Sequence, residues 1–155
     1  MMTARMRTAI PAAGVMAVVM LAPQPAVSPP RPKAEHVTVY RVASCQCCGR
    51  WADHLKASGF EVTVHVVENR DDAPPRARVP AQLRSCHTAT VAGYVVEGHV
   101  PADVVKELLR QRPPVEGLAV PGMPLGSPGM ESPTPEPYEV IAFDASGRTS
   151  VFARR

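Results

Sequence analysis

The sequence predicts one small α/β domain that follows an export signal. Between residues 37 and 116, short runs rich in β-branched residues alternate with runs of helical periodicity. Residues 117–137 are rich in Pro and Gly, and two further strand-like runs close the chain. Without its first 28 residues the 155-residue chain is long enough for one hydrophobic core but not for two.

The N-terminus has the pattern of a secretory signal peptide. Arg5 and Arg7 precede an uncharged apolar run at 9–22, and small residues follow up to Ser28. The apolar run is shorter than the roughly 20 residues that a membrane span requires. We therefore expect residues 1–28 to be a cleaved signal peptide and the mature protein to be periplasmic. An uncleaved N-terminal anchor is the alternative.

Charge excludes some classes of partner. The chain has 17 basic and 14 acidic residues, and loss of Arg5 and Arg7 with the signal peptide leaves 15 against 14. A nearly neutral domain has no excess of basic residues to attract nucleic acid or an anionic membrane, so we expect neither partner. We expect a monomer, with residues 29–36 as a proline-rich, flexible lead-in.

The elements from residue 37 to 116 follow a recognisable order. The predicted elements are a strand at 37–43, a helix at 47–59, a strand at 61–69, a loop with one short helix near 81–84, a hairpin at 88–99 around Ala92-Gly93, and a helix that begins at Pro101 and ends at Pro113. This β-α-β-(α)-β-β-α order is that of a thioredoxin-like domain over residues 37–116.

Residues 117–155 are predicted to form a C-terminal extension of the same domain. Its Pro/Gly/Met-rich part, 117–137, has no periodicity, and a loop this long is usually functional or disordered. The run at 138–155 is typical of a terminal β-hairpin around an Asp-Ala-Ser-Gly-Arg turn. Because structure is predicted at both ends of the loop, we expect the loop to fold over a site.

Three of the four cysteines lie in the run C-Q-C-C at the start of the first predicted helix. Cys45 and Cys48 have the C-x-x-C spacing of thioredoxin redox motifs and are the candidate redox pair. Their pairing would leave Cys47 to join Cys86, so two disulfides stay an alternative. Three crowded thiols are a poor way to cross-link distant segments, however, and the helix N-terminus favours thiolates.

The ligand types favour copper over zinc. A tetrahedral zinc site commonly uses two well-separated cysteine pairs, whereas thiolates together with thioethers are typical of Cu(I). Met123 and Met130 lie in Pro-Gly turns of the extension, where neither a helix nor a strand would direct them into the core. One thiolate can bridge two soft ions, so the cluster could hold more than one copper ion. Among the histidines, His87 beside Cys86 is the first candidate ligand, His99 the second, and His54 is expected at the surface.

Four motifs occur in the order found in a known family. They are V-Y-x-x-x-x-C-x-C-C-G-x-W-x-x-H-L, S-C-H-T-A-x-V-x-G-Y-V-x-E-G-H-V-P, G-L-A-V-P-G-M-P-x-G-S-P-G-M-E and D-x-x-G-R-T-S-V-F-A. Together they cover residues 37–155, and this part of the chain resembles the CopG-type periplasmic copper-resistance proteins, formerly a domain of unknown function. The resemblance implies a thioredoxin-like domain whose C-terminal extension helps to bind copper.

The resemblance also implies a role and a ligand set. Family members resemble oxidoreductases that interconvert Cu(I) and Cu(II) and assist copper-efflux systems or other periplasmic copper proteins. Carried over by motif, the metal ligands are the four cysteines, a methionine of the extension and a histidine: Cys45, Cys47, Cys48, Cys86, Met123 or Met130, and His87. The segment 68–84 departs from the family by being short and rich in proline, which makes the helix before Cys86 uncertain. S-C-H-T also has no proline where thioredoxins carry a cis-proline.

Three functions remain open from the sequence. The first is a periplasmic copper-binding protein of copper resistance that interconverts Cu(I) and Cu(II). The second is a thiol–disulfide oxidoreductase that acts through Cys45 and Cys48, and the third is a non-enzymatic Cu(I) chaperone. Disulfide exchange needs neither Cys47 nor the methionine loop, whereas a metal cluster needs both.

Overall fold

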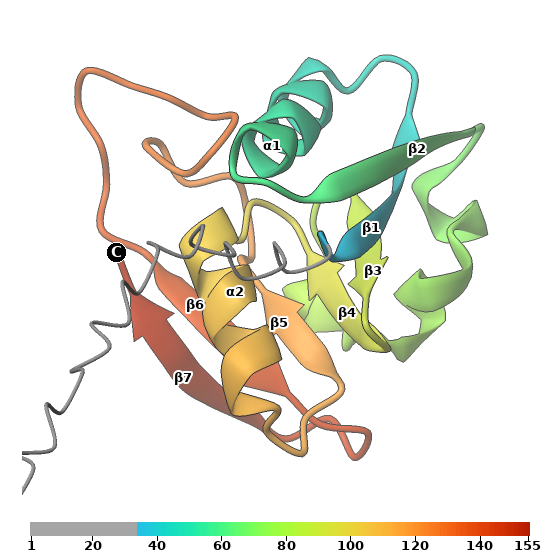
Figure 1. Cartoon of the computed structure of the whole chain (residues 1–155), viewed down its shortest axis with the longest axis vertical. Coiled ribbons are helices and arrows are strands. Elements are labelled where there is room, and N and C mark those ends of the chain that lie inside the picture. Colours follow the sequence, from blue (N-terminus) through green and yellow to red (C-terminus); the bar gives the residue numbers. More distant parts are fainter. Residues whose placement is uncertain (1–33) are drawn as a thin grey trace, which may run out of the picture. The chain divides into compact units, whose positions relative to one another are not determined.

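A seven-stranded mixed sheet runs through the computed structural model, which describes residues 34–155. The strand order is β2-β1-β3-β4-β5-β6-β7 (Figure 1). The predicted signal peptide, 1–28, and the first part of the predicted lead-in lie outside the described residues. Within residues 34–155, no helix has the length and apolar character needed to cross a membrane.

The first half of the sheet has the predicted order of elements. Strand β1 (His36–Val42), helix α1 (Gln46–Ala57) and strand β2 (Glu61–Val67) form a unit with parallel strands. Strands β3 (Thr88–Val91) and β4 (Tyr94–Glu97) form the predicted antiparallel hairpin, with β3 antiparallel to β1. Ala92 and Gly93 both have positive φ, as a tight two-residue hairpin turn requires. Helix α2 (Ala102–Gln111) follows.

The C-terminal extension continues the same sheet. Strand β5 (Gly117–Ala119) pairs in parallel with β4, and β6 (Glu139–Phe143) pairs antiparallel with β5. Strand β7 (Thr149–Arg154) completes the antiparallel terminal hairpin, which confirms that prediction together with the α/β class. The extension therefore adds three strands as well as the loop at 120–137.

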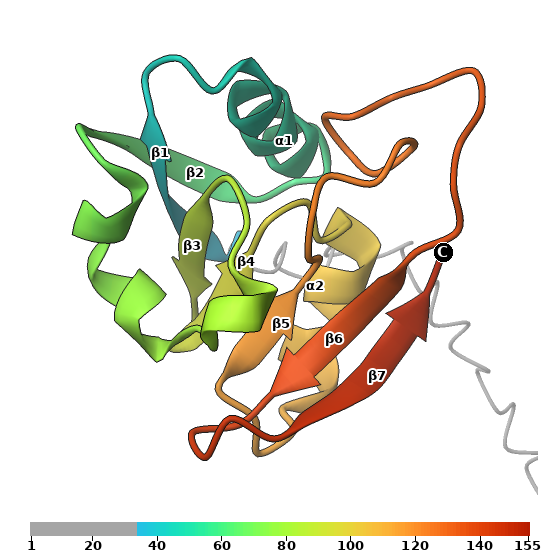
Figure 2. The same cartoon turned by 180° about the vertical axis from the view of Figure 1, so that it is seen from behind.

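The segment between β2 and β3 is more ordered than the sequence suggested. It forms three short 3₁₀ helices, Arg70–Asp72, Pro74–Arg78 and Ala81–Leu83, of which only the last was predicted. Prolines prevent a long α-helix here but suit short turns of this kind. The segment lies on the face of the sheet seen in Figure 2, where Val79 and Leu83 pack with Phe143.

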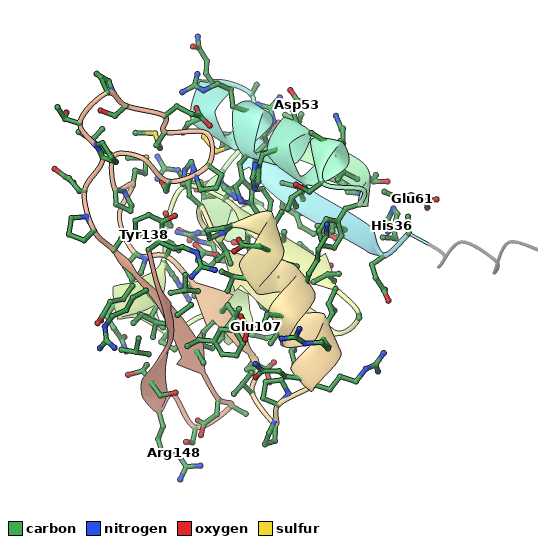
Figure 3. All side chains as sticks on the ribbon, turned by 60° about the vertical axis from the view of Figure 1, so that its left-hand side comes forward. His36, Asp53, Glu61, Glu107, Tyr138 and Arg148 are labelled. Atoms are coloured by element: carbon green, nitrogen blue, oxygen red, sulfur yellow. A yellow bond between two sulfur atoms is a disulfide. The ribbon has the colours of Figure 1, made fainter. Side chains whose placement is uncertain are left out.

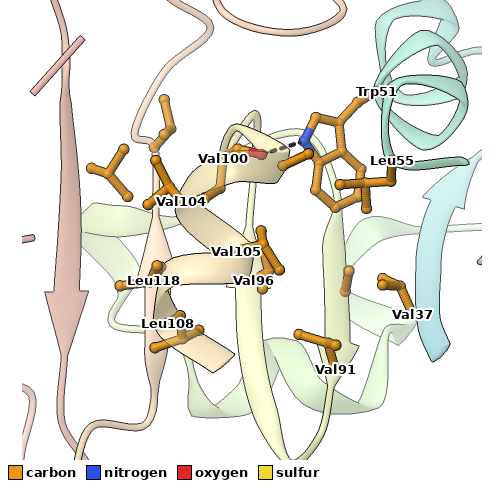
Figure 4. Close-up of a cluster of buried hydrophobic side chains, with 14 of the residues drawn as sticks. Val37, Trp51, Leu55, Val91, Val96, Val100, Val104, Val105, Leu108 and Leu118 are labelled. Carbon is orange, nitrogen blue, oxygen red and sulfur yellow. Dashed lines mark hydrogen bonds between the residues drawn. The ribbon is translucent and has the colours of Figure 1, made fainter. Parts of the chain in front are cut away.

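Helices α1 and α2 cover the other face and build the main core. Buried Trp51 and Leu55 from α1 and Leu108 from α2 pack against inward-facing strand residues (Figure 4). The Trp51 indole N–H donates to the carbonyl of Val100 at 2.8 Å, so this buried ring has its polar atom satisfied. Charged side chains such as Asp53 and Arg148 project outward (Figure 3). Trp51 thus holds α1 against the core.

Candidate metal centre

The start of α1 presents three cysteines at the carboxyl end of β1. Cys45 is the N-cap, and Cys47 and Cys48 lie in the first helical turn, which has no acidic residue. Unpaired backbone N–H groups and the helix dipole give this end partial positive charge, which favours thiolates. Arg41 stabilises the segment between β1 and α1, because its Nη1 donates to the carbonyl oxygens of Val42, Ala43 and Cys45 at 3.1–3.2 Å.

Cys86 completes a cluster of four sulfurs. It lies just before β3, and the pairing of β3 with β1 brings it to the start of α1. The Sγ atoms of Cys45, Cys47, Cys48 and Cys86 all lie within 4.8 Å of one another. Cys45 and Cys48 are joined in a disulfide, whereas Cys47 and Cys86 are free. The second disulfide of the two-bridge alternative, Cys47–Cys86, is therefore absent from this structure.

Two buried histidines extend the cluster on the side of Cys86. The Cys86 Sγ lies 3.3 Å from Nδ1 of His87 and 3.0 Å from Nε2 of His99, and these three atoms form a second group with metal-binding spacing. His99, ranked below His87 in the sequence analysis, is thus at least as close to the thiol. The Nε2 atom of His87 is buried without a hydrogen-bond partner among the described residues, although the ring packs on Trp51 at 4.4 Å.

Burial shifts the protonation of these groups in a consistent way. It raises the pKa of Cys86 to about 12, with a further rise from the neighbouring Cys47, so the thiol is protonated. Burial lowers the pKa of His87 to about 3 and also lowers the pKa of His99. His99 donates its Nδ1–H to the Pro128 carbonyl at 2.7 Å, which leaves the lone pair of Nε2 facing Cys86. Both imidazoles are neutral, as metal ligands must be.

A buried ion pair fixes the segment that carries Cys86 and His87. The fully buried Glu97 carboxylate accepts from Arg76 Nη1 at 2.7 Å and from the Ser85 backbone N–H at 2.5 Å. Its other oxygen accepts from the Thr88 hydroxyl at 2.6 Å, and Arg76 also donates to the Ser85 carbonyl. Burial raises the pKa of Glu97, against the lowering effect of these hydrogen bonds and of the Arg76 charge. The backbone on both sides of Cys86 is thereby anchored to β4.

The loop at 120–137 is tied to the cluster by its middle. Arg50 on α1 donates two hydrogen bonds to the Gly129 carbonyl, at 3.0 and 2.7 Å, and His99 holds the neighbouring Pro128. A Cβ atom on Gly129 would lie 2.6 Å from the Cys47 carbonyl oxygen, so only glycine allows the loop to approach α1 this closely. Figure 3 shows sulfur atoms gathered where this loop meets α1.

The two methionines of the loop differ in position. Met123 has half of its surface exposed and lines a cavity of about 240 Å³ together with Cys86. Met130 is half-buried, and its main chain closes a turn through hydrogen bonds with Gly126 and Ser127. Met123 is thus the methionine that shares an open space with a free thiol.

A further histidine lies elsewhere than the sequence predicted. His54 was expected at the surface, but it is half-buried, and its Nε2 accepts the backbone N–H of Ala102 at 3.1 Å. His54 therefore accepts from a backbone N–H at the start of α2 that has no partner within the helix, and burial lowers the pKa of His54.

No cis peptide bond occurs in residues 34–155, in agreement with the absence of proline from S-C-H-T.

Comparisons with known proteins give a consistent result. The chain is 44% identical to two solved structures described as copper resistance protein CopG, form 2 and form 1. These matches cover 79% of this chain and 99% and 98% of the other chains, with TM-scores of 0.74 and 0.73. A family model described as a protein of unknown function, DUF411, matches residues 83–130. Among curated proteins no match was found.

Proposed function

Because the chain belongs to the CopG copper-resistance protein family, we propose that it is a periplasmic protein that binds copper through its cysteine cluster and changes the oxidation state of the metal. The observation that carries the proposal is the convergence of four cysteine sulfurs within 4.8 Å, two of them free and one beside two neutral imidazoles. Soft thiolates select Cu(I), and the crowding lets one sulfur bridge two ions.

Loading of the full cluster requires reduction of the Cys45–Cys48 disulfide. Two electrons and two protons convert the disulfide to two thiols, and each thiol loses its proton when it binds Cu(I). Cys86 would also lose its proton, because its raised pKa keeps it protonated without metal. Copper affinity should therefore rise with pH. His99 and His87 would complete the coordination as neutral nitrogen donors, and Met123 or Met130 would add a thioether from the loop.

The same disulfide supports a redox role. Two Cu(II) ions can each take one electron from the Cys45–Cys48 dithiol, which becomes a disulfide and releases two protons. The free Cys47 sulfur lies 3.5 Å from the Cys45 sulfur, so thiolates remain beside the reduced copper while the pair is oxidised. Multiple turnovers of Cu(II) reduction with an added reductant would support the oxidoreductase. Stoichiometric Cu(I) transfer without turnover would instead support the chaperone.

A thiol–disulfide oxidoreductase that acts on proteins is the second candidate, favoured by the bonded C-x-x-C pair. The variant Cys47→Ser separates the two functions, because it leaves Cys45 and Cys48 in place. We expect it to weaken Cu(I) binding by more than about ten-fold, since loss of even a supporting contact to a metal ligand costs about 10–100-fold in affinity. Competition with bicinchoninate measures this affinity.

The control is insulin reduction by the same variant. Under the copper proposal, the Cys47→Ser protein keeps whatever disulfide-exchange activity the unmodified chain has. Unchanged Cu(I) affinity together with retained insulin reduction would contradict the copper proposal and support the thiol–disulfide oxidoreductase. The copper efflux system is the partner expected for either copper function.

A further inference from the structure

The cavity beside Cys86 is lined by arginines on its other side. Arg70, Arg76 and Arg84 come from the 3₁₀ segment and the strand-like stretch after it, and Cys86 and Met123 complete the wall. Its volume of about 240 Å³ lies just below the roughly 300–1,000 Å³ of most ligand pockets, so it suits only a very small organic molecule. The cavity thus joins a strongly basic wall to two soft sulfur atoms.

The positive charge of this wall is only partly compensated. Asp71 contacts Arg76 at 2.9 Å and Arg84 at 3.8 Å, and the buried Glu97 contacts Arg76 at 2.7 Å. Arg70 is exposed and makes no side-chain hydrogen bond or ion pair with residues 34–155. Two carboxylates therefore face three guanidinium groups, and the excess charge belongs to an arginine that is free to meet a ligand. Guanidinium groups bind carboxylates in a bidentate manner.

The sulfur side of the cavity specifies the rest of the ligand. Cys86 lines the cavity but is only 6% exposed, so a ligand can reach only a small part of this residue. Met123, with 50% exposure, lines the same cavity, and the Ser85 hydroxyl fixes the adjacent loop by donating to the Gly122 carbonyl at 2.7 Å. If the carboxylate of a small ligand binds to the arginines, a sulfur atom elsewhere in the same ligand would lie beside Cys86, at the other side of the cavity.

We propose that this cavity binds a small carboxylate-bearing thiol that carries Cu(I) to or from Cys86. Transfer is an exchange of ligands: a Cu–S bond to the carrier breaks, a Cu–S bond to Cys86 forms, and the Cys86 proton passes to the released carrier thiolate. Copper stays as Cu(I) throughout. The part that concerns copper rests on the proposed function, whereas the anion site does not.

The first test needs no copper. In the Cys47→Ser variant of the full chain with the Cys45–Cys48 disulfide intact, Cys86 is the remaining free thiol. Iodoacetate and iodoacetamide have almost the same shape, and both alkylate the thiolate: a C–S bond forms, iodide leaves, and the thiol proton goes to solvent. The ratio of their rates therefore reports how strongly the cavity attracts a carboxylate.

We expect Arg70→Gln and Arg84→Gln, each added to Cys47→Ser, to lower the iodoacetate-to-iodoacetamide ratio at least three-fold. The matched control is Arg110→Gln, which removes an exposed arginine of α2 whose one ion pair within residues 34–155 is with Glu107, at 3.6 Å. It should leave the ratio unchanged. The same ratio in all three variants would overturn the anion site.

The second test measures copper transfer to the reduced, otherwise unmodified chain. Cu(I) is supplied by N-acetylcysteine, which carries a carboxylate, or by N-acetylcysteine amide, which does not. We expect faster transfer from N-acetylcysteine, and loss of that preference in Arg70→Gln. Equal rates from both donors would overturn the carrier role. Failure to take up copper from either donor would count against the proposed function, and the alkylation ratios would still decide the anion site.

Discussion

Replacement of Arg76 by Met tests whether the buried ion pair holds the Cys86 segment in place. Arg76→Met puts a shorter, uncharged apolar side chain in place of the arginine and leaves Glu97, which is fully buried, without its counter-charge. The carboxyl group then folds in its protonated form. Since its ordinary pKa is 4.5, protonation at pH 7 costs at most about 3.4 kcal/mol, at about 1.36 kcal/mol for each pH step. This agrees with the roughly 3–5 kcal/mol lost when one partner of a buried pair is removed.

The pH dependence of this loss has a definite sign. Burial already raises the pKa of Glu97 in the unmodified chain, and loss of the Arg76 charge and hydrogen bond raises it further above the unfolded value. The stability that the protonated Glu97 contributes is therefore fully present below about pH 4.5 and is lost as the pH rises towards the pKa of Glu97 in the folded protein. The protonation cost falls from about 3.4 kcal/mol at pH 7 to about 0.7 kcal/mol at pH 5. A second cost, about 1–3 kcal/mol from the unpaired Ser85 carbonyl, does not depend on pH and remains at both pH values.

Urea unfolding at pH 7 and pH 5 measures both contributions. The control is Arg154→Met, which removes an exposed pair with Glu139 at 3.0 Å and should cost less than about 1 kcal/mol at either pH. An Arg76→Met protein that loses no more stability than Arg154→Met would refute the reasoning. A large loss that is the same at both pH values would refute the part assigned to Glu97.

Three further predictions concern the loop and the histidines. In urea unfolding, Gly129→Ala should destabilise the protein by about 1–3 kcal/mol more than Gly147→Ala. Both glycines have positive φ, but of the two only Gly129 would bring a Cβ against backbone atoms, those of Cys47 and Trp51. Equal losses would contradict the close approach of the loop to α1. Burial lowers the pKa of His87 from 6.5 to about 3, so the stability that neutral His87 contributes is fully present above about pH 6.5 and is lost as the pH falls, by about 1.36 kcal/mol for each pH step. His87→Phe should therefore flatten the decline of the unfolding free energy with falling pH in urea unfolding. An unchanged slope would contradict this assignment. His99→Ala should weaken Cu(I) binding about 10–100-fold in bicinchoninate competition, since its Nε2 faces Cys86; unchanged affinity would exclude His99 as a ligand or support.

Helices and strands were predictable from the sequence where the spacing of apolar residues indicates which side of the element is buried. The strand at the start of the domain, both helices and both hairpins follow from alternation, helical spacing and turn residues, and they place C-Q-C-C at a strand-to-helix turn. The two additional 3₁₀ helices were missed because the prolines at Pro74 and Pro75 interrupt any long pattern while allowing short turns. The burial of Pro75 and Arg76 in the second of these helices depends on packing against the sheet, which local sequence does not reveal.

His99 was underrated although the hairpin register contains a signal for it. Thr88 pairs with Glu97, and the backbone N–H of Gly98 donates to His87, so continuation of the same register places His99 opposite Cys86. A hairpin predicted around Ala92-Gly93 therefore already implied this neighbour. The disulfide state was not predictable, because the sulfur spacing allows both a bonded pair and a set of metal thiolates.

The central claim is that reduced thiols from both halves of the cluster hold copper together. Its most direct test is the copper content and copper-edge X-ray absorption of the full chain, reduced, loaded with Cu(I) and freed of excess metal. We expect bound copper with a coordination shell dominated by sulfur, and loss of sulfur neighbours in both Cys47→Ser and Cys86→Ser. A protein that retains no copper, or copper surrounded only by nitrogen and oxygen, would contradict it.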